Sequence, residues 1–139
     1  MKVFDFNEQD LVKKYLGVPF KHLGRSPKMG LDCYGLIKCF FGDLGIELID
    51  VEDYKKNWSK DGLNYFLDNY YKQFIEVPVP HPFDVVLFKN DEGVANHAGI
   101  VLSGDRFIHT SRVGTVVARL NELNNFKRIV GFYRIKQNA

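Results

Sequence analysis

The chain has few cysteines, no long apolar run and no concentration of charge of one sign. Each of these absences excludes a class of protein. Two cysteines in 139 residues cannot build the disulfide framework of a small secreted domain. No apolar run approaches the roughly 18 residues that a membrane-spanning helix needs. The opening residues lack the apolar stretch and small-residue cleavage site of a secretion signal. The sequence therefore predicts synthesis in the cytoplasm without a signal peptide and without membrane insertion.

Charge and size set two further limits. The formal net charge is +2, and Lys and Arg form no stripe, which gives no indication of nucleic-acid binding. Aromatic residues are plentiful, with 12 Phe, 7 Tyr and 1 Trp in the 139 residues, and a chain of this length can bury one core. We therefore predict a single domain over residues 1–139 and no nucleic-acid partner.

Cys33 stands where an apolar helix is expected to begin. Apolar residues follow it at the spacing of an amphipathic helix, namely Leu36, Ile37, Phe40, Phe41 and Leu44. Asp32 is a favourable N-cap, and Gly45 is a favourable residue just past the helix end. Unpaired N–H groups in the first helical turn favour an anion, which would lower the pKa of the thiol and suit a catalytic nucleophile. The alternative is a buried cysteine that acts only as a small hydrophobic residue.

The second cysteine, Cys39, lies six residues further along the same predicted helix. This spacing separates the two thiols by about 9 Å along the helix axis and about 120° around it. A disulfide cannot bridge that separation, so Cys39 is predicted to be a free thiol on the flank of the helix.

The chain divides into a helical first half and a strand-rich second half. A first helix is predicted from the N-cap Asn7 to Leu16, and a third over residues 63–74, where aromatic and apolar residues keep the helical spacing. Beyond three prolines, short strands are predicted at 84–88, 97–102, 106–109, 115–117 and 130–135. This order predicts an α+β fold with N-terminal helices packed on a small antiparallel sheet or open barrel.

Two histidines are expected to face one another on this sheet. The strands that carry His97 and His109 are joined by Ser103-Gly104-Asp105, a hairpin signal. A three-residue loop would place both histidines on one face, directly opposite or one step apart, whereas a two-residue loop would separate them. If that face packs on the cysteine helix, Cys33 gains a base, and the base gains an orienting group.

A zinc site is the competing interpretation of the same three residues. Zinc sites usually combine Cys and His at short local spacing with a fourth ligand. No such spacing occurs in the sequence, so we predict neither a metal nor another cofactor.

Several segments together resemble the NlpC-type family, which contains papain-like cysteine peptidases of bacterial and phage cell-wall degradation. The resemblance spans roughly residues 11–135 in order, through YLGVPF at 15–20, GRSP at 24–27, LDCYGL at 31–36, PFDVVLF at 82–88, HAGIV at 97–101, FIH at 107–109 and GFYR at 131–134. The segment PFKHLGR at 19–25 is most similar to phage tail-associated members. The resemblance implies a papain-like fold and hydrolysis of an amide in peptidoglycan stem peptides, most often between γ-D-glutamyl and a diamino acid.

The resemblance also implies roles for individual residues. Cys33 corresponds to the nucleophile, His97 to the general base and acid, and His109 to the polar residue that orients His97. The backbone N–H of Cys33 and a neighbouring donor would form the oxyanion hole. The resemblance also suggests Asp32, Tyr34 and Phe20 at the substrate, and His22 is expected there because it lies in the loop before the cysteine.

The chain departs from the family pattern at three of these motifs. Phe20 stands where the family often has Tyr, so a hydroxyl is missing there. Tyr34 stands where the family usually has a small Ser that, with the preceding Asp, helps bind a peptide amine in some members. Phe83 stands where a turn glycine is common, which we interpret as a local change without catalytic meaning.

A wall substrate would lie outside the cytoplasm, although the sequence has no export signal. The phage-like loop favours transport as part of a virion tail, with a tail protein as partner through the surface around Tyr54, Trp58 and Tyr65. Release by lysis and action on recycled wall fragments are the other routes. A non-catalytic tail component and a related papain-like acyltransferase are the alternative functions.

Overall fold

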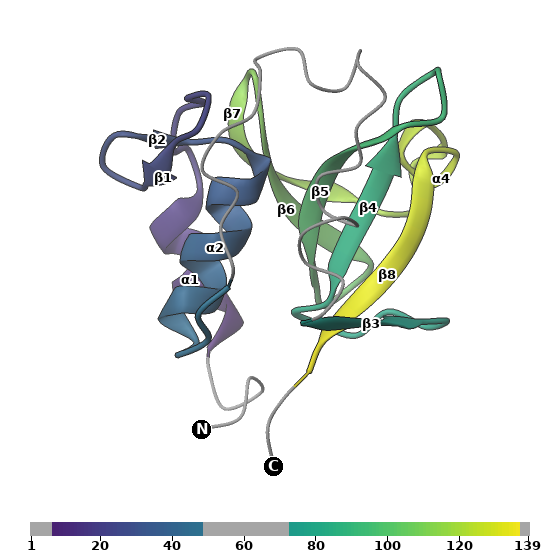
Figure 1. Cartoon of the computed structure of the whole chain (residues 1–139), viewed down its shortest axis with the longest axis horizontal. Helices are drawn as coiled ribbons and strands as arrows, with labels where there is room; N and C mark the ends of the chain where they lie inside the picture. The colour runs from purple at the N-terminus through teal and green to yellow at the C-terminus, as the bar shows by residue number, and fades with distance from the viewer. Residues whose placement is uncertain (1–6, 49–72, 137–139) are drawn as a thin grey trace.

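A computed structural model describes residues 7–48 and 73–136. In Figure 1, helices α1 and α2 form one layer, and most of the strands form a second layer beside them. The elements in chain order are α1 (Glu8–Tyr15), β1 (Arg25–Ser26), β2 (Gly30–Leu31), α2 (Cys33–Asp43), β3 (Phe74–Val77), β4 (Val85–Lys89), β5 (Ala95–Leu102), β6 (Arg106–Ser111), β7 (Gly114–Arg119), α4 (Leu123–Phe126) and β8 (Ile129–Ile135). The predicted α+β fold is confirmed.

Helix α1 begins and ends as its sequence predicts. The Asn7 side chain accepts hydrogen bonds from the backbone N–H groups of Gln9 and Asp10, at 2.9 and 3.3 Å. Gly17, just past the helix, has a positive φ of 85°, a conformation that glycine adopts without steric cost.

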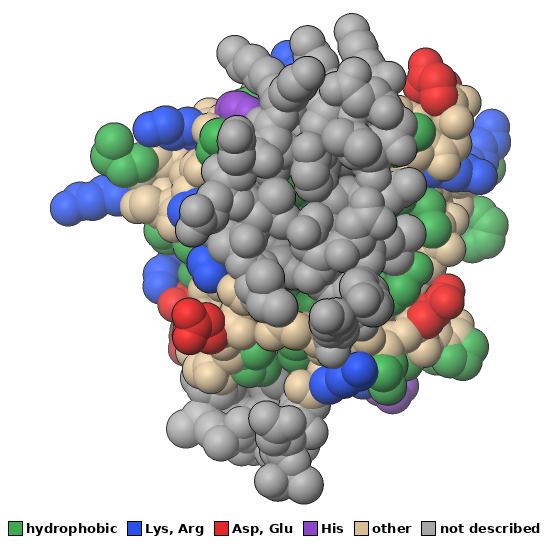
Figure 2. All heavy atoms as spheres, in the orientation of Figure 1, with side chains coloured by type: hydrophobic (Ala, Val, Ile, Leu, Met, Phe, Trp, Pro, Cys, Tyr) green, Lys and Arg blue, Asp and Glu red, His purple; other side chains and the backbone are tan. Residues whose placement is uncertain are grey.

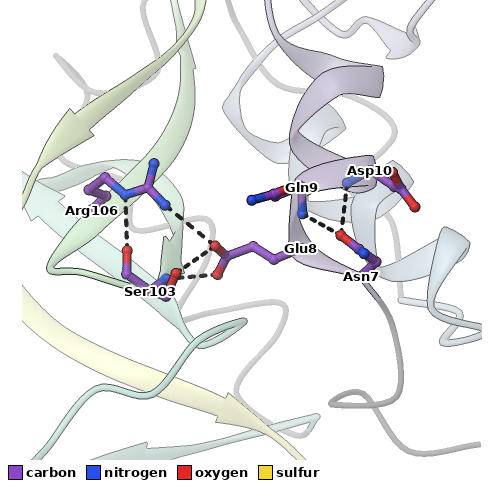
Figure 3. Close-up of polar contacts among 6 residues, drawn as sticks. All are labelled: Asn7, Glu8, Gln9, Asp10, Ser103 and Arg106. Carbon is purple, nitrogen blue, oxygen red and sulfur yellow. Dashed lines mark hydrogen bonds and ion pairs between the residues drawn. The ribbon is translucent and has the colours of Figure 1, made fainter.

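A carboxylate at the start of α1 ties this helix to the sheet. Glu8 accepts hydrogen bonds of 2.7 Å from both the backbone N–H and the hydroxyl of Ser103, and Arg106 lies 3.5 Å from the same carboxylate (Figure 3). Ser103 is the first residue of the turn between β5 and β6. The contact therefore fixes the helical layer against the hairpin that carries both histidines.

The principal sheet has six strands in the order β3-β8-β4-β5-β6-β7, and all of its pairings are antiparallel. Within the described residues it ends at β3 and β7 and does not close into a barrel. The five predicted strands correspond to β4 through β8. The short strands β1 to β3 and the one-turn helix α4 were not predicted, because two to four residues carry too little periodicity.

The third predicted helix largely lies outside the described residues, as do Tyr54, Trp58 and Tyr65. Its last residue, Phe74, was wrongly placed in a helix, because it begins strand β3 and pairs with Ile135. The ring of Phe74 is buried against Phe41, with the ring centroids 5.7 Å apart. One apolar residue satisfies helical and strand patterns equally, so the spacing alone could not exclude β3.

The two faces of the sheet bury different sets of side chains. One face packs on α2, where Leu36, Ile37 and Phe40 share a core with Ala98 and Ile100. The opposite face carries a second, smaller cluster formed by Val86, Phe88, Val101, Phe107 and Leu120. The helical layer thus covers only one side of the sheet.

The turn that leads into β4 contains a strained residue and a buried ion pair. Phe83 has a φ of 75°, in the left-handed region that favours glycine, while its buried ring packs edge-on against Phe40 at 5.6 Å. Next to it, the Asp84 carboxylate receives two hydrogen bonds of 2.9 Å from the Arg134 guanidinium. Phe83 therefore adds core packing at the expense of a strained backbone conformation.

Within the described ranges, no helix combines the length and apolar character needed to cross a bilayer. Figure 2 shows Lys and Arg interspersed with Asp and Glu over the coloured part of this face, rather than gathered into a stripe.

Candidate active site

The loop before α2 fixes the position of Cys33. Asp32 is the N-cap, and its carboxylate accepts hydrogen bonds from the backbone N–H groups of Gly35 and Leu23, at 2.8 and 3.0 Å. The Arg25 guanidinium forms an ion pair with the same carboxylate at 2.8 Å. A Cβ on Gly35 would clash with the Gly24 carbonyl oxygen, so only glycine allows this loop to pack on the first helical turn. Cys33 is therefore the first residue of α2, as predicted.

The two histidines form a hydrogen-bonded pair. Of the two loop lengths that the sequence left open, the hairpin has the three-residue one, with Leu102 paired to Arg106. Continuing this register places His109 opposite Gly99, one same-face step from His97. The His97 Nε2 and His109 Nδ1 atoms lie 2.7 Å apart.

Gly99 provides the space for this pair. A Cβ at Gly99 would lie 2.9 Å from the Ile108 carbonyl oxygen and 3.2 Å from the His109 Cβ. The imidazoles also stand on aromatic rings, with centroids 5.9 Å apart for Phe88 and His97 and 4.7 Å apart for Phe107 and His109. The missing side chain at Gly99 thus lets His109 lie close to β5, and the rings of Phe88 and Phe107 border the two imidazoles.

One expectation about this arrangement was wrong. The histidines share the sheet face of Phe88 and Phe107, whereas α2 packs on the opposite face. They nevertheless border a cavity with Cys33, because this cavity lies where β5 begins and β6 ends. Residues from both faces of the two strand ends line it.

The cavity has a volume of about 340 Å³ and is hereafter called the cleft. Its lining includes all seven residues singled out from the sequence: Cys33, His97, His109, Asp32, Tyr34, Phe20 and His22. The cleft brings these residues together; their individual roles stay predictions. Tyr34 is almost fully buried, and the Asp32 carboxylate is engaged by the helix and by Arg25, so both also serve the fold.

Sequence reasoning missed four further residues that line the cleft: Asn96, Thr110, Ser111 and Arg112. Each directly precedes or closely follows one of the two histidines, so proximity in sequence was the available signal. Thr110 is buried and shares a hydrogen bond of 2.6 Å with the Thr115 hydroxyl, which in turn donates to the Val18 carbonyl. Arg112 is exposed and places a cation at the cleft.

Burial determines the protonation states of the three central groups. It raises the pKa of the Cys33 thiol to about 12, with a further contribution from the Asp32 carboxylate. Hydrogen bonds to the backbone of Ala98 and Tyr34 lower this pKa but do not outweigh burial. The sequence predicted that the helix N-terminus would lower this pKa, but burial raises it, since removal from water disfavours the charged form.

Partial burial also keeps both imidazoles neutral, although each histidine is only half-buried. It lowers the pKa of His97 to about 3, assisted by repulsion from a charged His109, and it lowers the pKa of His109 to about 4. At neutral pH the site thus holds a thiol and two neutral imidazoles rather than an ion pair.

No cluster suited to a metal ion occurs among residues 7–48 and 73–136. In particular, these ranges hold no group of three or more His, Cys, Asp and Glu side chains in a ligating arrangement.

Comparison with known proteins shows which family this chain is similar to. The model of the NlpC/P60 family matches residues 17–134. The Gamma-DL-glutamyl hydrolase of Bacillus subtilis (strain 168) is 34% identical over 102 residues, which are 72% of this chain and 22% of that protein. The chain thus spans about a fifth of the length of this curated relative.

Solved structures of similar fold come from the same family. A lipoprotein-like NLP/P60 family protein of Staphylococcus aureus subsp. aureus Mu50 matches with a TM-score of 0.68 and 24% identity. The match covers 96% of this chain and 43% of the Staphylococcus chain. The NlpC/p60 domain of the peptidoglycan hydrolase SagA matches with a TM-score of 0.57 and 19% identity. The match covers 95% of this chain and 100% of the SagA domain. At these identities, the likeness establishes the fold.

Proposed function

The chain belongs to the NlpC/P60 family, and from that premise we propose that it is a cysteine peptidase that hydrolyses amide bonds in peptidoglycan stem peptides. One observation carries the proposal: Cys33, His97 and His109 line one cleft, and the His97 and His109 rings are hydrogen-bonded at 2.7 Å. A nucleophile, a base and a group that orients the base are the three parts required for acyl transfer through a thiol.

The pairing of the imidazoles assigns their nitrogen atoms. Because His97 Nε2 faces His109, Nδ1 is the atom of His97 that takes the proton from the Cys33 thiol. For Nδ1 to accept, Nε2 must carry a hydrogen and donate it to His109 Nδ1. His109 thereby fixes the tautomer of His97 and stabilises the imidazolium that forms during the attack.

The reaction proceeds in two halves. The Cys33 sulfur attacks the amide carbonyl while its proton moves to His97, and the backbone N–H of Cys33 stabilises the oxyanion. The His97 imidazolium then protonates the leaving amine, the C–N bond breaks, and a thioester on Cys33 remains. Water, deprotonated by His97, hydrolyses the thioester and releases the carboxylic acid and the free thiol.

We propose the amide between γ-D-glutamyl and a diamino acid as the scissile bond. The relative of Bacillus subtilis is named as a hydrolase of γ-DL-glutamyl substrates, and it shares 34% identity with this chain. SagA is named as a peptidoglycan hydrolase. These names support a γ-glutamyl linkage in a wall peptide as the first substrate to test.

The test is product analysis with purified muropeptides. Mass spectrometry should detect a free diamino-acid amine with the native protein and no product with Cys33→Ala. The matched control is Cys39→Ala, which removes the other thiol of the same helix outside the cleft and should keep full activity. Persistent activity of Cys33→Ala would contradict the mechanism, whereas turnover of a thioester or lipid but no muropeptide would favour a related acyltransferase.

We also propose that the protein acts at the cell wall as a component of a phage tail. The phage-like segment at residues 19–25 supports this location. Mass spectrometry of purified particles tests it, because a tail component must be present in them. Absence from particles, together with cleavage of free peptides but not of intact sacculi, would favour recycling in the cytosol. Presence in particles without any Cys33-dependent cleavage would favour a non-catalytic tail component.

A further inference from the structure

Strand β5 contains one extra residue immediately before His97. In the pairing of β4 with β5, Phe88 lies opposite His97. The next pair joins Lys89 to Ala95, which leaves Asn96 without a partner on β4. This irregularity is a β-bulge, which interrupts the alternation of side chains along a strand and changes the direction of those beside it. Asn96 accordingly lines the cleft together with its neighbour His97.

Asn96 lies close to the sulfur that is expected to attack the substrate. Two residues further along β5, the backbone of Ala98 hydrogen-bonds the Cys33 sulfur. A strand advances about 3.3 Å per residue, so the backbone of Asn96 lies about 7 Å from that of Ala98. The Asn96 side chain can therefore reach a group of the substrate one residue away from the amide that Cys33 attacks.

The Asn96 carboxamide makes no hydrogen bond to the described part of the protein. Two other asparagines near the histidine pair are engaged in the fold. The Asn90 oxygen accepts from two backbone N–H groups at 3.0 Å, and the Asn125 nitrogen donates to the Arg119 carbonyl at 2.7 Å. Asn96 is half-buried, and a polar group removed from water costs free energy unless it finds a partner. Its amide is therefore available to a ligand in the cleft.

A carboxamide is suited to one kind of partner in particular. It offers a donor, Nδ2, beside an acceptor, Oδ1, and a peptide group offers the complementary acceptor and donor. Two other polar side chains of the cleft are already engaged, because the Thr110 hydroxyl bonds to Thr115 and the Ser111 hydroxyl accepts from the Val113 N–H. Asn96 thus provides the chemistry for binding a peptide group of the substrate.

The position of Asn96 beside His97 indicates which side of the scissile bond it meets. In the proposed mechanism, the His97 imidazolium protonates the leaving amine. That nitrogen must therefore come within hydrogen-bond distance of the ring. The residue that carries the leaving nitrogen is then the part of the substrate nearest to the start of β5.

We propose that the Asn96 carboxamide binds the peptide group that follows the leaving amine, with Nδ2 donating to its carbonyl oxygen and Oδ1 accepting from its N–H. The inference rests on the proposed function, because attack by Cys33 defines the leaving side. The cleft should then favour a leaving residue that continues into a further amide over one that ends in a free carboxylate. A carboxylate has no N–H to donate, and its second oxygen would face the Asn96 oxygen.

The first test uses two stem peptides that differ only at the carboxyl group of the diamino acid, one a carboxamide and the other a free acid. The measured quantity is the kcat/KM of the carboxamide divided by that of the acid. Asn96→Leu keeps the size of the side chain but removes both polar atoms. It should lower this ratio about 5- to 10-fold, the value of one hydrogen bond. An unchanged ratio would overturn the inference.

Asn96→Asp should change the same ratio in the opposite direction. Its carboxylate still accepts from the N–H of the carboxamide but repels the free acid, so the ratio should rise. An effect of either variant on His97 applies equally to both substrates and cancels in the ratio. A ratio that falls in both variants would show that Asn96 does not contact this group, and would overturn the inference.

Asn124→Leu is the matched control, because it makes the same chemical change at an exposed residue of α4 that does not line the cleft. Its ratio should stay within about twofold of the native value, as expected for a surface substitution. Circular dichroism of each variant verifies that the fold is retained. A control that lowers the ratio as much as Asn96→Leu would overturn the assignment to Asn96.

The second test measures binding without turnover, which separates the inference from the proposed function. Both stem peptides are titrated calorimetrically into Cys33→Ala and into Cys33→Ala/Asn96→Leu. Tighter binding of the carboxamide peptide that disappears with Asn96→Leu supports the contact even if the native protein hydrolyses neither peptide. Equal affinity for the two peptides with and without Asn96, or no binding of either, overturns the inference even if muropeptides are cleaved.

Discussion

Partial burial of two neutral imidazoles should make the protein lose stability when the pH falls from 7.5 to 5. The folded pKa values are about 3 for His97 and about 4 for His109, both below the ordinary histidine value of about 6.5. Between the folded and unfolded values, the unfolded chain binds more protons than the folded protein. Stability therefore rises with pH in this window and is lost as the pH drops below about 6.5.

The size of the effect follows from the same values. At pH 5 an unfolded histidine of pKa about 6.5 is almost fully protonated, whereas folded His97 and His109 are still neutral. Acidification from pH 7.5 to pH 5 therefore lowers the free energy of unfolding by about 2 kcal/mol for each histidine. This value is 1.36 kcal/mol per pH unit over the roughly 1.5 pH units between the unfolded pKa and pH 5. The pair together should cost about 4 kcal/mol.

Urea unfolding at pH 7.5 and pH 5 measures this difference, and the variant His109→Gln isolates one contribution. Glutamine cannot titrate but keeps an amide that can hydrogen-bond to His97. The variant should lose about 2 kcal/mol less than the native protein on acidification, whatever its stability at pH 7.5. The same pH dependence in the native protein and the variant would refute the claim that the folded protein keeps His109 neutral at pH 5.

Three further predictions concern the residues that support the site. Phe83→Ala should destabilise the protein by about 3–5 kcal/mol through loss of a buried ring. Phe83→Gly should be about 1 kcal/mol more stable than the alanine variant, because φ is 75° at this position. Thermal unfolding in which the glycine variant is less stable than the alanine variant would contradict this order. Arg134→Ala should cost about 3 kcal/mol, because it leaves the buried Asp84 carboxylate without its cation, and Arg134→Lys should recover part of that loss in the same assay. Gly99→Ala should lower kcat by about 10- to 100-fold by displacing His109, and unchanged kinetics would show that the glycine does not set the imidazole position.

Local sequence signals predicted the parts of the site that depend on short-range structure. The helix that starts at Cys33 follows from Asp32 and the apolar spacing, because capping and periodicity act within a few residues. The histidine pair follows from the length of the turn after Leu102, because a hairpin loop sets the register of both strands. These two elements account for the shared cleft.

Long-range packing was beyond the sequence. The histidines lie on the sheet face opposite α2, which depends on how the whole sheet packs and not on the alternation within β5 or β6. The raised pKa of Cys33 has the same origin, since burial by distant residues outweighs the local effect of the helix N-terminus.

The central claim is that Cys33 forms a covalent thioester with the acyl part of a wall peptide. Rapid acid quenching of the protein during turnover of a stem peptide, followed by intact and peptide-level mass spectrometry, tests it directly. The account predicts an adduct equal in mass to the acyl fragment, located on Cys33 and absent from Cys39, which accumulates more slowly in His97→Ala. Substrate cleavage at full rate without any adduct on Cys33, or an adduct on another residue, would contradict it.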